Sequence, residues 1–170
     1  MKAFGIVGYS GSGKTTLLCA LIPYLREAGL RVAAIKATHH DIDWDQPGKD
    51  SYRLREAGAE AVLLQGPERC FVVRRSPRHW RTTLDLLGTG LDLVLVEGNK
   101  DWPIPKIEVH RPALGRGLWA EQDPQVIAVA SDGPLTGPAA DTLPRLDLND
   151  PPAIGRYLLT SMGWRITEEP

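Results

Sequence analysis

The chain of 170 residues has only two cysteines and almost no net charge, and both features narrow the range of its functions. Cys19 and Cys70 stand far apart with no Cys-x-x-Cys spacing, so the sequence indicates neither a zinc knuckle nor a disulfide framework. We expect both to be reduced thiols in the core. A formal net charge of -1 removes any general electrostatic argument for a nucleic acid partner.

Long apolar runs, internal repeats and low-complexity tracts are also missing. The longest run that looks buried, residues 91–96, contains Asp92 and is far too short to span a bilayer. The apolar stretch after Lys2 leads directly into a glycine-rich loop, unlike a secretory signal. The sequence therefore predicts a cytoplasmic globular protein with no membrane segment and no nucleic acid partner.

Strands and helices are predicted to alternate along the chain. The run at residues 93–96 is apolar at every position, as expected for a central parallel strand covered on both faces. Helical spacing follows the first strand and returns after Asp150. This order predicts an α/β fold of three layers, with a mostly parallel central sheet. The other predicted strands of this sheet are residues 3–7, 32–35, 107–109 and 126–129.

An insertion is predicted between the second strand and the central one. Runs at residues 61–64 and 70–74 flank a Gly-Pro turn, which indicates a β-hairpin region around residues 61–81 of one domain, residues 1–170. Asp50 or Ser51 is placed to cap a short helix before it. Basic side chains gather on and after the hairpin, where a solvated face or a contact with an anionic cofactor or partner would explain them: Arg69, Arg74, Arg75, Arg78, His79 and Arg81.

Residues 8–15 match the pattern G-x-x-x-x-G-K-[ST] between a predicted strand and a predicted helix. In this motif consecutive backbone N–H groups curl around phosphates, and the helix start adds partial positive charge. Lys14 is expected to reach the β- and γ-phosphates, Thr15 to bind Mg2+ and Thr16 to contact the α-phosphate. The predicted phosphate-binding residues are Gly8, Ser10, Gly11, Ser12, Gly13, Lys14, Thr15 and Thr16.

Two acidic residues follow predicted strands and would complete a nucleotide site. Glu97 ends the central strand, where open α/β sheets place their ligands, and is a candidate Mg2+ ligand or water-positioning group; a solvated carboxylate is the alternative. Asp132 follows the strand at residues 126–130, where a carboxylate can accept hydrogen bonds from guanine N1 and N2, and a simple loop cap is the alternative. The N-K-D tripeptide at residues 99–101 differs from the guanine-reading N-K-x-D motif, because its aspartate comes one residue early.

Further blocks of sequence surround these residues. They are I-K-A-T-H-H-D at residues 35–41, P-G-K-D-S-Y-R-L-R-E-A-G-A at residues 47–59, L-V-E-G-N-K at residues 95–100 and A-V-A-S-D at residues 128–132. Together with the phosphate loop, they resemble the molybdopterin-guanine dinucleotide biosynthesis adapter protein B family (MobB). The Thr-His-His-Asp and Pro-Gly-Lys-Asp-Ser blocks are not shared by P-loop proteins in general.

The resemblance implies a P-loop NTPase fold that binds GTP and Mg2+, usually as a homodimer, with weak GTPase activity. The family assists the molybdenum cofactor guanylyltransferase that joins GMP to molybdopterin, so this enzyme is the expected partner and molybdopterin a further candidate ligand. By its position after the second strand, Asp41 is expected to act near the γ-phosphate and Mg2+, together with Lys14 and Glu97. Asp50 is expected to cap its helix.

Two other functions stay open on the sequence alone. A metallochaperone GTPase would use His39 and His40, but adjacent side chains reach one metal only in a loop, since on a strand they face opposite ways. An ATP-dependent small-molecule kinase or ligase would use the same fold and prefer adenine. No arginine finger or switch glutamine is recognisable, so hydrolysis is expected to be slow unless a partner completes the site.

Overall fold

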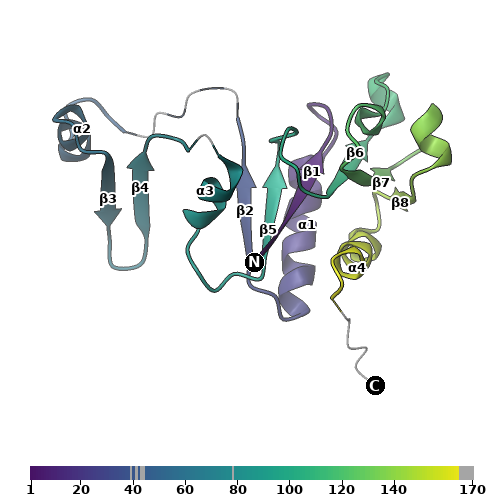
Figure 1. Ribbon diagram of the computed structural model, residues 1–170, viewed down its shortest axis with the longest axis horizontal. Coiled ribbons are helices and arrows are strands. Elements are labelled where there is room, and N and C mark those ends of the chain that lie inside the picture. The colour runs from purple at the N-terminus through teal and green to yellow at the C-terminus, as the bar shows by residue number, and fades with distance from the viewer. Residues whose placement is uncertain (39, 41, 43–44, 78, 165–170) are drawn as a thin grey trace. The chain divides into compact units, whose positions relative to one another are not determined.

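Figure 1 shows the computed structural model of the chain, which describes residues 1–38, 40, 42, 45–77 and 79–164. The chain divides into two compact units. Met1–Ala37 and Gly88–Pro170 form the first unit, and Thr38–Leu87 forms the second. The organisation as one domain with an insertion stays a prediction.

A six-stranded sheet is the centre of the first unit, with the strand order β2-β5-β1-β6-β7-β8 and all neighbours parallel. The predicted α/β fold with a mostly parallel sheet is confirmed. β8 adds an outer strand that the apolar pattern does not reveal. The strands are β1 (Lys2–Val7), β2 (Val32–Lys36), β5 (Leu93–Glu97), β6 (Lys106–His110), β7 (Val126–Ser131) and β8 (Arg145–Asp147).

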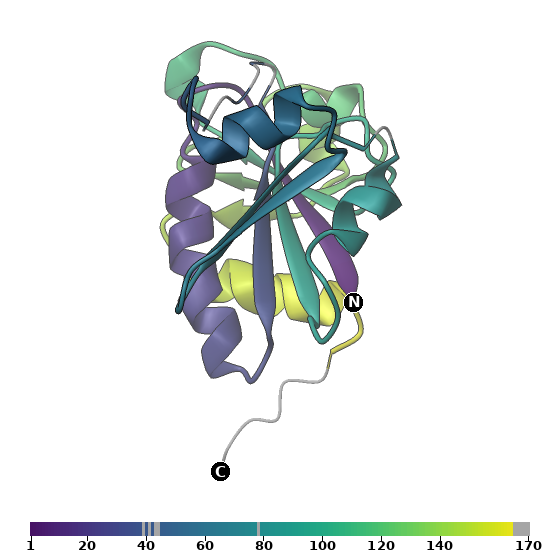
Figure 2. The ribbon, with the colours of Figure 1, turned by 90° about the vertical axis from the view of Figure 1, so that its left-hand side faces the viewer.

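Two α-helices, α1 (Lys14–Glu27) and α4 (Pro151–Ser161), share one core cluster with the sheet. Figure 2 shows both helices, which pack against each other. Gly155 permits this close packing, because a Cβ atom there would stand 2.4 Å from Cδ1 of Tyr24. The carboxylate of Asp150 caps α4 by accepting a hydrogen bond from the Ala153 N–H at 3.0 Å. The helix predicted after Asp150 is confirmed.

The opposite face of the sheet carries two short 3-10 turns, η2 (Trp119–Glu121) and η3 (Pro138–Asp141), while a third, η1 (Pro112–Leu114), follows β6. Val129 of β7 belongs to a second apolar cluster with Leu118 and Ala139, whereas its neighbours Ala128 and Ala130 belong to the first. Because side chains alternate along a strand, the two clusters lie on opposite faces. The turns η2 and η3 therefore contribute to the third layer of this unit.

In the part of the second unit that the structure describes, there are two helices and a two-stranded antiparallel sheet. The elements are α2 (Asp50–Glu56), β3 (Ala61–Gln65), β4 (Cys70–Arg74) and α3 (Trp80–Asp85). The predicted hairpin strands are confirmed. We call β3 and β4 the apolar ribbon, because four of their large hydrophobic side chains are exposed: Leu63, Leu64, Phe71 and Val72.

Two expectations are wrong. Both Cys19 and Cys70 are free thiols at exposed positions rather than in the core, since Cys19 lies on the face of α1 opposite its buried leucines. Neither predicted residue caps α2: Lys49 takes the N-cap position without a side-chain hydrogen bond, and Asp50 is already helical. The Ser51 hydroxyl instead donates a hydrogen bond to Oδ1 of Asp45 at 2.7 Å. Among the residues that the structure describes, no helix is long and apolar enough to cross a bilayer.

Candidate nucleotide-binding site

The predicted site residues of the first unit gather at the carboxyl edge of its parallel sheet. Strand order reverses at β1, since β5 lies on one side of it and β6 on the other. Open α/β sheets bind ligands at such a reversal, outside the carboxyl ends of the strands. The glycine loop at residues 8–13 lies there, because it connects the end of β1 to the start of α1.

The loop is tightly curled because Gly8, Gly11 and Gly13 all have positive φ angles, of 138°, 78° and 100°. A Cβ atom at Gly8 would stand only 2.3 Å from the carbonyl oxygen of Val109 on β6. The hydrogen bond from Leu17 N–H to Gly13 O, at 2.9 Å, closes the first turn of α1. The N–H groups of residues 14–16 come before the first hydrogen bond of the helix, so they remain available to an anion at the helix N-terminus.

Ser12 and Lys14 add side-chain donors to the loop, while Ser10 and Gly11 lie exposed. The Ser12 hydroxyl is buried and has no hydrogen-bond partner among the described residues. The Lys14 ammonium donates to the Tyr9 carbonyl at 2.8 Å, which holds it over the loop. A buried hydroxyl without a partner and a cation at a helix start together suit a phosphate.

The pKa of Lys14 lies below its ordinary value. Partial burial lowers it most, and the charges of Lys100 and Lys36 lower it further, although Glu97 raises it. The ammonium groups of Lys36 and Lys100 therefore lie close enough to Lys14 to repel its charge. A polyanionic ligand would relieve this repulsion.

Thr15 and Glu97 meet beside the loop, as the prediction of a Mg2+ site requires. The Thr15 hydroxyl donates to the carboxylate of Glu97, with Oγ1 at 3.0 Å from Oε1 and 2.8 Å from Oε2. Hydroxyl and carboxylate oxygens are ligands that Mg2+ prefers, so these residues fit the metal. Asp41, the third predicted metal and catalytic residue, lies outside the described residues, as does His39.

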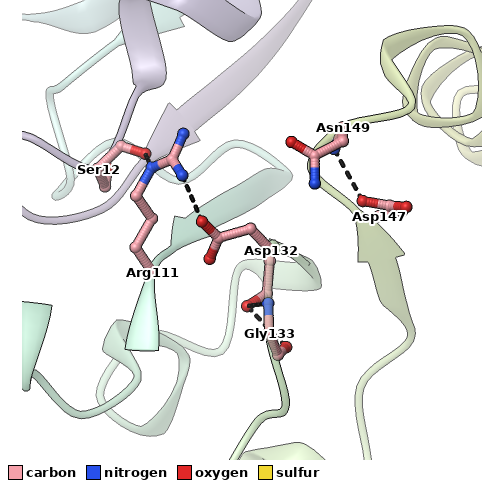
Figure 3. A network of polar contacts seen from close by, with 7 residues as sticks. Ser12, Arg111, Asp132, Gly133, Asp147 and Asn149 are labelled. Atoms are coloured by element: carbon pink, nitrogen blue, oxygen red, sulfur yellow. Dashed lines mark hydrogen bonds and ion pairs between the residues drawn. The ribbon is translucent and has the colours of Figure 1, made fainter. Parts of the chain in front are cut away.

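On the other side of the loop, Arg111 joins the loop to Asp132 (Figure 3). Its Nε–H donates to the Ser12 carbonyl at 3.0 Å, and its Nη1 forms an ion pair with Asp132 Oδ2. Asp132 follows β7 as predicted, but the turn after the strand is held by Ser131, whose hydroxyl accepts from the Gly133 N–H at 3.3 Å. Arg111 was not predicted; the signal for it is its place directly after β6.

A hollow opens beside Arg111, between α1 and the connection from β8 to α4. Its walls are about equally polar and apolar, and the side chain of Asn149 adds an amide donor and acceptor. The backbone N–H of Asn149 is bound by the carboxylate of Asp147 at 2.8 Å (Figure 3). The wall residues of the hollow include Thr16, Leu17, Ala20, Leu148 and Pro151.

Lys100, from the N-K-D tripeptide, lies over aromatic rings beside the loop. Its ammonium is 3.6 Å from the centroid of the Trp119 ring and 5.1 Å from that of Tyr9. The buried carboxylate of Glu108 accepts the backbone N–H groups of Trp119 and Ala120, both at 2.8 Å, and so holds this ring in place. Lys100 thus adds positive charge next to the phosphate loop.

Known proteins share both the sequence and the fold of this chain. The family described as molybdopterin guanine dinucleotide synthesis protein B, MobB, matches residues 3–132. The chain belongs to the MobB family. The resemblance inferred from the sequence blocks is therefore confirmed.

Individual members of the MobB family match most of the chain. The molybdopterin-guanine dinucleotide biosynthesis adapter protein of Haemophilus influenzae is 45% identical over 159 residues, which cover 91% of this chain and 85% of that protein. Its Escherichia coli counterpart is 42% identical over 160 residues, covering 91% and 89%. The crystal structure of a MobB homolog from Bacillus stearothermophilus has a TM-score of 0.69 at 28% identity, covering 97% of this chain and 100% of that one.

The contact between Gly8 and β6 predicts a difference between two glycines of the loop. Gly8→Ala should lower the melting temperature by about 5 °C or more, because the added Cβ overlaps the Val109 carbonyl and costs about 2 kcal/mol or more. Gly11→Ala, also at positive φ but with open space around it, should cost clearly less. Thermal unfolding followed by circular dichroism measures both. Equal losses would show that the contact with β6 is unimportant.

Proposed function

We propose that the protein binds GTP with Mg2+ and acts as an adapter in the synthesis of molybdopterin guanine dinucleotide, with slow GTP hydrolysis. The observation that carries the proposal is the meeting of the phosphate loop with the Thr15–Glu97 pair at the carboxyl edge of the sheet. Membership of the MobB family supports the pathway, since the relatives are named as adapter proteins of that synthesis.

Each part of the loop has a task in this proposal. The amides at the start of α1 bind the phosphates, and Lys14 exchanges the Tyr9 carbonyl for the β- and γ-phosphates. Thr15 and Glu97 hold Mg2+, which when bound neutralises charge on the phosphates. Asp41 stays the proposed third group at the metal and the γ-phosphate.

Asp132 and the hollow beside Arg111 account for the choice of base. A carboxylate accepts two hydrogen bonds from guanine N1 and N2, whereas adenine has an acceptor at N1 and no amino group at position 2. Arg111, which lines the hollow and is anchored to the Ser12 carbonyl, holds this carboxylate through an ion pair. Adenine would present a ring acceptor to this carboxylate, which is only 27% exposed, in place of two donors, and a site built to accept hydrogen bonds from its ligand rejects one that lacks the donors.

Calorimetry with GTP and ATP in the presence of Mg2+ tests nucleotide binding and base choice. Wild type should prefer GTP, and Asp132→Asn should reduce that preference by about tenfold or more, since it replaces an acceptor by a donor. Asp101→Asn is the control, because the carboxylate of the N-K-D tripeptide has no role in this proposal. Equal affinities of wild type for GTP and ATP, or an effect of Asp101→Asn as large as that of Asp132→Asn, would refute the assignment.

The apolar ribbon supports the proposal of a homodimer. Leu63, Leu64 and Val72 are between 45% and 58% exposed, and the ribbon has only two strands, so its edges can pair with a second copy of the chain. We propose that the dimer acts in the cytoplasm with the molybdenum cofactor guanylyltransferase. Molybdopterin is the proposed further ligand of the complex that the two proteins form. The alternative functions on the same fold are a metallochaperone GTPase and an ATP-dependent small-molecule kinase or ligase.

A charge on the ribbon should weaken the dimer. Phe71 is 57% exposed, so Phe71→Glu should fold and shift the mass measured by light scattering after gel filtration toward the monomer at micromolar concentration. Leu114→Glu introduces the same charge at an exposed leucine of the first unit and should leave the mass unchanged. A wild type that is monomeric, or a dimer unaffected by Phe71→Glu, would exclude this interface.

A further inference from the structure

Lys36 contacts two of the groups that are proposed to hold Mg2+, Thr15 and Glu97. Its Nζ atom lies 3.3 Å from Thr15 Oγ1 and 3.5 Å from Glu97 Oε1. The position follows from the sheet, because Lys36 is the last residue of β2 and pairs in register with Glu97 at the end of β5. An ammonium group thus stands beside the same oxygens that a metal cation would use.

The two partners of this ion pair differ in their freedom to move. The Glu97 side chain is 11% exposed, whereas that of Lys36 is 67% exposed. A lysine has a flexible four-carbon stem, so its ammonium can leave while the carboxylate stays. Glu97 is therefore the fixed member of the pair and Lys36 the exchangeable one.

The charges at the site favour replacement of the Lys36 ammonium by a divalent cation. A nearly buried carboxylate is costly without a counter-ion, and the Lys36 ammonium supplies one. A divalent cation between Thr15 and Glu97 would bring two further positive charges into contact distance of this ammonium. Their repulsion would displace the ammonium, since the more highly charged ion interacts more strongly with the carboxylate.

We propose that Lys36 is the resident counter-cation of the magnesium site. It neutralises Glu97 and holds Thr15 until Mg2+ arrives with the nucleotide, and then gives way to the metal. When Mg2+ is withheld, its ammonium bridges Glu97 to the bound phosphates in place of the metal. The inference rests on the proposed nucleotide binding and adds that Lys36 sets how strongly this binding depends on Mg2+.

The test compares GTP affinity by calorimetry in excess Mg2+ and in excess EDTA, using wild type and Lys36→Gln. Without Mg2+ the variant lacks both cations, so its affinity should fall about tenfold relative to wild type. In Mg2+ the metal replaces the ammonium in both proteins, so their affinities should differ by less than about threefold. The ratio of the dissociation constants in EDTA and in Mg2+ should therefore increase in Lys36→Gln.

Two further variants separate this role from general effects of charge. Arg26→Gln removes one positive charge at the far end of α1 and should leave the ratio as in wild type. Lys36→Arg keeps the positive charge and should keep most of the Mg2+-independent binding. Because the Lys36 side chain is largely exposed, Lys36→Gln and Lys36→Arg should both leave the fold intact, which urea unfolding verifies.

The possible failures are distinguishable. If Lys36→Gln leaves the ratio unchanged, the proposal is wrong whether or not the affinity itself falls, since a structural ion pair or a general attraction acts alike in both buffers. If wild type binds GTP but Lys36→Gln has the same ratio of dissociation constants as wild type, the proposed nucleotide binding stands and only the role of Lys36 fails. If wild type binds GTP in neither buffer, nucleotide binding and the role of Lys36 fail together.

Discussion

The contact between the glycine loop and β6 is the constraint on which the rest of the site depends. Gly8 approaches the Val109 carbonyl so closely that no side chain fits between them. Arg111, two residues after Val109, donates a hydrogen bond to the Ser12 carbonyl. The loop is therefore fixed to the sheet at both of its ends. This keeps the unbonded amides of the first helical turn at the carboxyl edge, where groups from other strands arrive.

Each neighbouring strand delivers one charged group to that edge. Lys36 and Glu97 end β2 and β5, and Arg111 and Asp132 directly follow β6 and β7. Because all these strands are parallel, their ends lie together. In the proposed function, this arrangement separates two tasks: the side of β2 and β5 would hold the metal and the distal phosphates, and the side of β6 to β8 would hold the base. Arg111 links the two sides through the loop.

Much of this fold and site could be predicted from the sequence because it follows local rules. The loop motif and the apolar run before Glu97 are visible without knowing the strand order. Arg111 and Lys36 were not predicted, since their roles depend on which strands become neighbours. β8 has only one partly buried apolar residue, Leu146, so periodicity could not reveal it. The burial of Cys19 was predicted wrongly because its identity does not say which face of α1 meets the sheet.

The central claim is that the amides at the start of α1 hold the phosphates of the nucleotide. Backbone NMR spectra recorded while Mg2+ and GTP are added test this most directly, because each amide reports its own hydrogen bond. We expect the amides of residues 11–16 to shift furthest and to saturate at one nucleotide per chain. Saturation of binding with these amides unchanged, and shifts confined to other parts of the chain, would contradict the account.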